Sequence, residues 1–352
     1  MNKLTKVGCS ALCGSLAAIS AANAGDLTAT GSAHVTWISK GNDTTGNPIG
    51  INSGFSLKGS GEFDNGWTYA LTIAHTDAGA YSAANVDLGL GGLGKLNFNQ
   101  GDSGNGIAAI DDKMPTAWEE SWGAGLSTGV RTAVGAGSSQ NVQYTTPTVM
   151  GTTLTFTLAP EYGVSDTAEK STAAAGSAKK RAYDATININ PSLGTEILSG
   201  LNLFGGASTI ESVESNASLA DIYEAVGGFT YALGPVTIGA QVSADYTGND
   251  GDTTGAYNLY KNQAYGVAFN VNDDLSISYG EWEARKAGYN SGRATAQIDN
   301  ALRTVTVESW QVAYTMGGAS VRVANTKVEN AHWSTSAAED KKATTISMGL
   351  AF

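Results

Sequence analysis

The chain has 352 residues, with 20 basic and 32 acidic side chains, and its formal net charge is −12. This acidic balance disfavours nucleic-acid binding, because that function usually needs a basic surface. The 45 glycines, set against only 6 prolines and accompanied by 14 tyrosines and 7 tryptophans, are unusual for an ordinary globular domain and favour a β-barrel with tight turns and aromatic-bearing strands.

Residues 1–24 have the pattern of a secretory signal peptide. Two lysines precede an uncharged stretch, and Ala22-Asn23-Ala24 has the small-x-small pattern of a cleavage site. The apolar part is too short and too rich in small residues to anchor the protein in a membrane. We therefore expect cleavage after Ala24 and a single mature domain comprising residues 25–352.

Cleavage would change both the redox chemistry and the charge of the chain. Cys9 and Cys13 lie within the signal segment, so the mature chain would have no disulfide or thiol chemistry. Removing two lysines and no acids leaves 18 basic and 32 acidic side chains, which gives a net charge of −14. One interpretation is acidic solubility, and another is an acidic vestibule or pore that attracts cations.

Hydropathy gives no evidence for a membrane helix. No stretch after residue 24 reaches the roughly 18 apolar residues that such a helix needs. The slightly polar mean hydropathy alone would suggest a soluble protein. A transmembrane β-barrel is not excluded by this test, because polar lumen residues dilute its lipid-facing residues.

Apolar residues alternate with small or polar residues from the start of the expected mature chain. The pattern runs from Leu27 to Trp37 and returns from Phe55 to Phe63 and from Trp67 to Ile73. Successive side chains of a strand point to opposite faces, so each segment is a predicted strand with one apolar face. Asp64-Asn65-Gly66 predicts a tight hairpin turn between the second and third segments.

Further alternating segments follow, separated in turn by short and long connections. The clearest segments contain Leu154 to Leu158, Ile187 to Ile189, Val236 to Val242, Tyr265 to Val271, Trp310 to Tyr314 and Val321 to Val323. Short links such as Gly91 to Gly94 and Met316 to Gly318 alternate with long polar segments such as Lys40 to Asn47 and Glu161 to Lys180. This asymmetry is typical of barrels with short periplasmic turns and long external loops.

The last seven residues form the most distinctive strand. Ile346, Met348, Leu350 and Phe352 share one face, while the residues between them are small. We expect lipid on the first face and water on the second.

The mature length predicts about sixteen strands, since 328 residues are available at roughly 20 residues for each strand and its link. In lipid, no sheet edge can stay unpaired, so the sheet must close. The predicted fold is an all-β, transmembrane antiparallel β-barrel. Trp37, Trp67 and Tyr314 are predicted to lie at the bilayer interface.

The longest break in the alternation extends from Gly101 to Ser139. A loop of this length is usually functional or disordered. Its acids lie beside apolar and aromatic residues: Asp111, Asp112, Glu119 and Glu120 accompany Met114, Pro115, Trp118 and Trp122. Folding the loop into the barrel would bury the tryptophans and set the carboxylates in the lumen.

These features together resemble the general trimeric porins of Gram-negative outer membranes. The resemblance covers the whole mature chain, including the long third loop, the strand Asn141 to Pro147 after it and the terminal Phe352. It implies a sixteen-stranded barrel, a homotrimer in contact with outer-membrane lipids and lipopolysaccharide, and a third loop that narrows the barrel from inside.

In such porins, acids on the inserted loop face bases on the opposite wall. The matching loop acids are Asp111, Asp112, Glu119 and Glu120, for which ordinary solvated loop charge is the alternative interpretation. Lumen parity selects Lys58, Arg322 and His34 on the wall, although parity does not fix depth. Gln143 stands where an arginine often precedes the tyrosine, so the strength of the transverse field stays open.

Two further chemistries, calcium binding and catalysis, are open to residues of this sequence. Asp250 and Asp252 could hold a calcium ion, but the segment lacks the twelfth-position glutamate of the helix-loop-helix calcium site, and the alternative is a plain loop. No other cofactor is expected. The histidines His34, His75 and His332 have no zinc-ligand spacing and lie far in sequence from a serine in a nucleophile motif, so we expect no enzyme activity.

The predicted function is passive diffusion of small hydrophilic solutes and ions, with cations or neutral nutrients favoured over anions. The alternative is a secreted β-sandwich adhesin or carbohydrate-binding protein. A sandwich would share the glycines and the alternating strands, but it would not explain the ending on Phe352.

Overall fold

The computed structural model describes residues 25, 27–43, 46–76, 83–100, 104–123, 125–164, 179–191, 198–212, 220–248, 257–288, 297–298, 304–334, 336 and 339–351. Among these residues, no helix combines the length and the apolar character needed to cross a membrane. The predicted signal segment, Phe352, Asp250 and Asp252 lie outside the described residues.

Nearly all regular structure is β-strand. The strands are β1 (Leu27–Gly41), β2 (Ile49–Glu62), β3 (Thr68–Thr76), β4 (Ala83–Gly89), β5 (Lys95–Asn99), β6 (Asn141–Thr145), β7 (Thr152–Ala159), β8 (Lys179–Ile189), β9 (Leu201–Ser212), β10 (Ile222–Leu233), β11 (Val236–Tyr246), β12 (Tyr257–Asn270), β13 (Leu275–Gly288), β14 (Gln297–Ile298), β15 (Val305–Met316), β16 (Ala319–Glu329) and β17 (Lys341–Ala351). Short 3-10 turns are η1 (Gly91–Leu93), η2 (Gly106–Ile110), η3 (Ser121–Gly123), η4 (Gly135–Ser138) and η6 (Ala331–Trp333).

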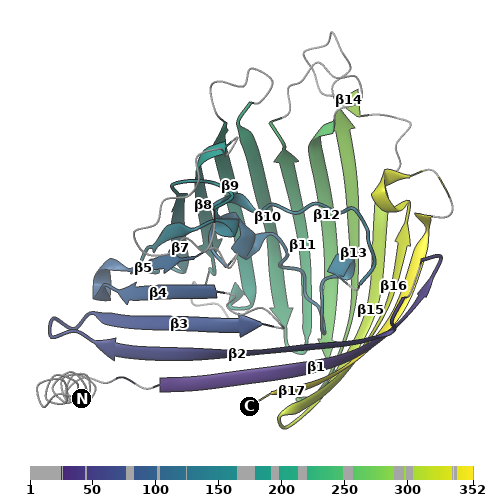
Figure 1. The fold of residues 1–352 in the computed structure, drawn as a ribbon, viewed down its shortest axis with the longest axis horizontal. Coiled ribbons are helices and arrows are strands. Elements are labelled where there is room, and N and C mark those ends of the chain that lie inside the picture. The colour runs from purple at the N-terminus through teal and green to yellow at the C-terminus, as the bar shows by residue number, and fades with distance from the viewer. Residues whose placement is uncertain are drawn as a thin grey trace, which may run out of the picture.

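The strands form one antiparallel sheet that closes on itself (Figure 1). Apart from β14, each strand pairs with its neighbours in sequence, and β1 also pairs with β17, where Val35 lies opposite Met348 and Trp37 opposite Ile346. The two-residue β14 pairs only with the end of β13, and β13 continues the wall by pairing with β15. Sixteen strands therefore make the closed wall, which confirms the predicted antiparallel barrel.

The two faces of the wall differ as the alternation predicted. On β17, Ile346 and Met348 are 41% and 48% exposed and point outward, whereas Ser347 between them is 1% exposed and points inward. Large apolar side chains on strands far apart around the wall share this exposure, among them Phe55 on β2, Phe156 on β7 and Val312 on β15. A soluble protein rarely exposes so continuous an apolar surface.

The connections alternate between short turns and long loops. Gly66, in the turn between β2 and β3, has a φ of +81°, which glycine adopts without steric cost. The link from Leu233 to Pro235 joins β10 with β11, and the predicted link from Met316 to Gly318 joins β15 with β16. Short turns thus lie at one end of the barrel and long loops at the other.

The buried apolar core lies inside the barrel, between the wall and the segment that joins β5 to β6. Ile107 and Ile110 of that segment pack with Phe204 and Val226 of the wall. A second cluster joins Leu126 of the segment to wall residues that include Trp282. Burial inside this barrel therefore depends on a long loop that fills part of its interior.

Candidate functional site

The segment between β5 and β6 follows the inner wall of the barrel, as the teal-blue trace after β5 shows (Figure 1). We call residues 104–140 the inner loop. The prediction of a long third loop between the fifth and sixth strands, folded into the lumen, is confirmed.

Asp184 on β8 binds the inner loop at two places, on the outgoing passage that follows β5 and on the returning passage that leads to β6. Its carboxylate accepts hydrogen bonds from the backbone N–H of Ile107 at 2.9 Å and of Ala136 at 3.0 Å. Ile107 belongs to η2 on the outgoing passage and Ala136 to η4 on the returning one. A single buried carboxylate therefore fastens the two passages together and to the wall, and hydrogen bonds to a charged acceptor are among the stronger ones.

Two further wall carboxylates hold the returning passage. Glu224 on β10 accepts a hydrogen bond from the N–H of Gly135 at 2.7 Å. Asp245 on β11 pairs with Arg131, whose guanidinium also lies 5.4 Å from the ring centre of Tyr260. The negative charge of Asp245 is thus neutralised by a loop arginine rather than offered to the lumen.

Amide side chains hold the outgoing passage. Gln241 on β11 accepts from the N–H of Lys113 at 3.0 Å and donates to the carbonyl of Asp111. Gln311 on β15 accepts from the N–H of Glu119 at 3.0 Å and donates to the carbonyl of the same residue. A glutamine side chain can satisfy a backbone donor and a backbone acceptor at once. Gln241 and Gln311 therefore form with the loop backbone the hydrogen bonds that a neighbouring strand would otherwise supply.

Gln143 on β6 also binds the inner loop, through a 2.8 Å hydrogen bond from the N–H of Gly106 to its Oε1. Asn105, which precedes Gly106 in the loop, donates to the side-chain oxygens of Asn97 and Asn141 at 2.8 and 2.7 Å. Gln143, where the sequence lacks an arginine, is therefore a loop anchor without charge.

Inward-facing glycines let the loop backbone approach the wall closely. A Cβ atom at Gly239 would lie 2.7 Å from Cδ of Pro115, and one at Gly266 would lie 2.9 Å from the Pro115 carbonyl oxygen. Both distances are shorter than van der Waals contact, so a larger residue at either position would displace the loop.

The tip of the loop brings the predicted acids together beside Arg322. Burial is the largest cause of a net upward shift in the pKa of both Asp112 and Glu119. The charge of Glu120 raises both pKa values further, whereas the charge of Arg322 on β16 opposes the upward shift of Glu119. The charge of Lys113 also lowers the pKa of Asp112, so four carboxylates, the Arg322 guanidinium and the Lys113 ammonium share this part of the lumen.

Asp111 differs from the other acids because it is 8% exposed. Burial, followed by the charge of Asp112, raises the pKa of Asp111 to about 7. This carboxyl group is therefore part of the loop's own packing and is partly protonated at neutral pH.

The other predicted wall residues lie apart from the loop acids. Lys58 lines a hollow of about 650 Å³ together with Glu62, Asp87 and Lys95. Glu62 directly precedes one short turn and Lys95 follows another, so this hollow is near the short-turn end. His34 lies on β1 against Gly349 of β17, on the lumen face.

The wall carboxylates and amides that hold the loop were not predicted from the sequence. Asp184, Glu224 and Asp245 alternate with outward-facing Tyr183, Tyr223 and Ala244, so their lumen parity was available as a signal. The identity of their loop partners was not, because these lie 48 to 114 residues away in sequence.

The fold also brings one histidine to a serine. Ser127, within Gly125-Leu126-Ser127-Thr128-Gly129, has its Oγ 3.0 Å from Nε2 of His332, although the two residues are far apart in sequence. The strand-turn-helix setting of a nucleophile elbow is absent at Ser127, which follows η3 in an extended part of the loop. Nδ1 of His332 faces the backbone of Gly129, so within the described residues the pair has no orienting carboxylate.

The remaining histidine, His75, lies on the outside of the barrel. His75 stacks on Phe55, with 5.4 Å between ring centres, on the outward face. Within the described part of the chain, no group of three or more histidine, cysteine, aspartate or glutamate side chains is arranged to hold a metal ion.

Comparison with solved structures gives a consistent result along almost the whole chain. An anion-selective porin from Comamonas acidovorans has a TM-score of 0.60 at 14% identity, with 93% of this chain and 99% of that chain covered. The outer membrane channel DcaP of Acinetobacter baumannii has a TM-score of 0.62 at 12% identity, covering 93% and 97%. The chain has the porin fold.

A third porin-fold structure is the trimer form of OmpT, an outer membrane protein of Vibrio cholerae, with a TM-score of 0.62, 11% identity and coverage of 94% of this chain and 100% of that chain. No family model matches the sequence, and no curated protein matches it. The shared porin fold therefore rests on the closed barrel and its connections, and not on sequence identity.

Proposed function

We propose that this protein is an outer-membrane channel through which small hydrophilic solutes and ions diffuse passively. The observation that carries the proposal is the closed sixteen-stranded wall with an apolar exterior and an inner loop fastened to one side of its polar interior. Lipid suits the first surface and water the second. The inner loop then sets the bore.

The alternative of a secreted β-sandwich is not favoured. A sandwich needs two packed sheets, whereas β1 pairs with β17 and closes a single sheet. The channel proposal also includes no enzyme activity, since the Ser127 and His332 pair lacks the setting described above.

We infer cation or neutral-solute preference from the tip of the loop. Asp112, Glu119 and Glu120 outnumber the neighbouring Lys113 and Arg322, so the proposed local charge is negative. Asp111 contributes less, because its pKa is raised to about 7. A homotrimer is the assembly that fits this proposal, by likeness to a porin-fold protein described as a trimer.

Reversal potentials in planar bilayers test the selectivity. Replacing the four acids by amides (D111N, D112N, E119Q and E120Q) is expected to lower the cation-to-anion permeability ratio, and Arg322→Gln to raise it by about twofold, since one charge in water contributes less than about 1 kcal/mol at a few Å. Lys58→Gln is the control on the distant part of the wall. Equal ratios for the wild type and the four-amide variant would remove the assignment of the constriction.

A further inference from the structure

A second segment of the chain is inserted into the barrel beside the far end of the inner loop, residues 126–130. This segment, residues 330–334, belongs to the long connection between β16 and β17 and contains η6. Its Ala331 and Trp333 are buried in the same apolar cluster as Leu126 of the far end. We call residues 330–334 the clasp.

The clasp and the start of β17 hold three consecutive residues of the far end, Ser127 to Gly129. The N–H of His332 donates to the Thr128 carbonyl at 2.9 Å, and Oγ of Ser127 lies 3.0 Å from Nε2 of the same histidine. Lys341 donates to the Ser127 carbonyl at 3.3 Å. Gly129 packs directly on the clasp, because a Cβ atom there would lie 2.8 Å from Nδ1 and 3.1 Å from Cα of His332.

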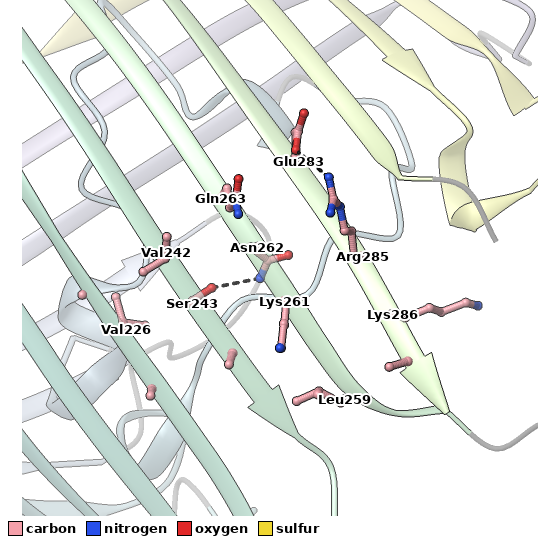
Figure 2. Close-up of a pocket in the computed structure, with 14 residues that line it drawn as sticks. Val226, Val242, Ser243, Leu259, Lys261, Asn262, Gln263, Glu283, Arg285 and Lys286 are labelled. Atoms are coloured by element: carbon pink, nitrogen blue, oxygen red, sulfur yellow. Dashed lines mark hydrogen bonds and ion pairs between the residues drawn. The ribbon is translucent and has the colours of Figure 1, made fainter. Parts of the chain in front are cut away.

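The far end lies between two strand anchors of the inner loop. One is the bond of the Glu119 N–H to β15, and the other is the 2.7 Å bond from Asn262 on β12 to the Arg131 carbonyl. Asn262 also donates to Ser243 on β11 at 3.0 Å, as Figure 2 shows. In the described residues 120–123 and 125–130, the hydrogen bonds that come from outside the loop are those of the clasp and of β17.

The backbone of the clasp is strained. Asn330, His332 and Trp333 have φ values of +54°, +56° and +59°, which lie in the left-handed region. Asparagine and histidine visit this region more readily than most residues, whereas a bulky tryptophan seldom does. Such conformations persist only where the surrounding contacts hold them, and they cluster at clamps and switch regions.

Contacts between Trp333 and the wall hold the clasp in this conformation. Nε1 of Trp333 donates to the carbonyl of Ala284 on β13 at 3.0 Å. Its ring centre lies 5.5 Å from that of Tyr260 on β12 and 4.7 Å from the ammonium of Lys286 on β13. The clasp is therefore attached to the wall on one side and to the inner loop on the other.

We propose that the clasp positions the far end of the inner loop and thereby keeps the pore open, with His332 and Trp333 as positioning residues. The inference rests on the proposed channel function. Without the clasp, the part of the loop between Glu119 and Arg131 would remain fastened only at its two ends. It would then swing within the lumen and not leave it, and each excursion would interrupt the ion current.

Two glycines of the inner loop supply a matched pair of variants. Gly129 and Gly125 have φ values of +80° and +76°, so alanine at either position adds a similar backbone strain. At Gly129 the new methyl group would meet both the backbone and the ring of His332. At Gly125 it would meet only Cδ1, the end of the flexible Ile38 side chain, at 2.9 Å. A difference between the two variants therefore reports the contact with the clasp.

Single-channel recordings in planar bilayers test the proposal. Gly129→Ala and His332→Ala should each raise the frequency of closures by about fivefold or more, as expected for losing a contact equivalent to one hydrogen bond. Gly125→Ala should close about as rarely as the wild type. Closure frequency separates positioning from stability, because a barrel that is merely less stable would insert less often without changing the pore that it forms.

A reversible cross-link between the clasp and the loop gives a second test. Cysteines that replace Ser127 and His332 are to be joined by a short bis-methanethiosulfonate, and the predicted mature chain has no cysteine of its own. The unjoined S127C/H332C pore should close more often than the wild type. Joining should return the closures to the wild-type frequency or below, and reduction should restore them.

Either of two results would overturn the proposal: joined pores that close as often as unjoined ones, or Gly129→Ala pores that close no more often than Gly125→Ala pores. The gel mobility of unheated and boiled samples verifies folding of each variant. The glycine pair keeps every hydrogen-bonding group of the clasp, so it tests the contact even where a change at His332 prevents folding. A silent wild type would contradict the channel itself, whereas a conducting wild type with unchanged variants would contradict only the clasp.

Discussion

The inner wall of the barrel has two halves that are built differently. Along β8 to β15 it presents carboxylates, amides and glycines that hold the inner loop, as Asp184, Gln241 and Gly266 do. Along β1 to β4 and at the start of β5 it presents polar side chains that bind one another, as in the 2.8 Å ion pair of Lys95 with Asp87, whereas Asn97 further along β5 accepts from Asn105 of the loop. The covered half determines where the loop lies, and the open half borders the space that the loop leaves.

This difference shows that net charge is a poor guide to pore charge. Asp184, Glu224 and Asp245 are acids of the covered half, yet each is occupied by loop N–H groups or by Arg131. The acidic composition therefore reflects loop attachment as well as any field that acts on ions. The selectivity proposed above depends only on the few acids at the loop tip.

The largest effect is expected from Asp184→Ala. This change leaves the N–H groups of Ile107 and Ala136 without their acceptor, at a cost of about 3 kcal/mol or more in loop attachment. The loop should detach from the covered half, so single-channel conductance and the size limit for neutral polymers should both rise. Glu62→Ala on the open half is the control and should change neither. A wild-type size limit in the Asp184 variant would show that the loop is held by other contacts.

A smaller effect is expected from Gly266→Val. The added side chain would meet the Pro115 carbonyl and Met114, and such overpacking costs about 1–3 kcal/mol. The loop should shift toward the open half and reduce conductance. Gly59→Val, where open space surrounds the Cβ position, should leave conductance unchanged. Equal conductance of both variants would contradict the close approach of loop and wall.

The smallest effect concerns pH. Because the pKa of Asp111 is raised from 3.8 to about 7, the folded loop holds a proton that the unfolded chain releases. The stabilisation from this group is complete below about pH 3.8 and declines as pH rises toward 7, while the ionised carboxylate adds negative charge to the lumen. Cation preference should therefore increase modestly between pH 5 and pH 8, measured by reversal potential. The same increase in D111N would assign the titration to another group.

The sequence predicted the wall better than the site. Period-two alternation and short turns such as Asp64-Asn65-Gly66 located the hairpins, because both are local properties of a strand and its neighbour. The length of the inner loop and its tryptophans predicted insertion. The link between β8 and β9, residues 190–200, was not among the connections identified from the sequence, and most of it lies outside the described residues.

The sequence could single out the loop acids because they form two adjacent pairs close together in the loop, Asp111 with Asp112 and Glu119 with Glu120, whereas their surroundings come from distant parts of the chain. Parity selected Arg322, Lys58 and His34 for the lumen face but could not give their depth, and in the structure it is Arg322 whose charge acts on a loop acid, Glu119. The burial of Asp111 depends on the long-range contact between its carbonyl and Gln241, which no local pattern contains.

Conductance of the purified wild-type protein in planar bilayers tests the central claim most directly. A water-filled barrel narrowed by its inner loop predicts discrete, stepwise current increments that scale with salt concentration and need no energy source. Membranes that stay electrically silent after insertion of correctly folded, heat-modifiable protein would contradict it.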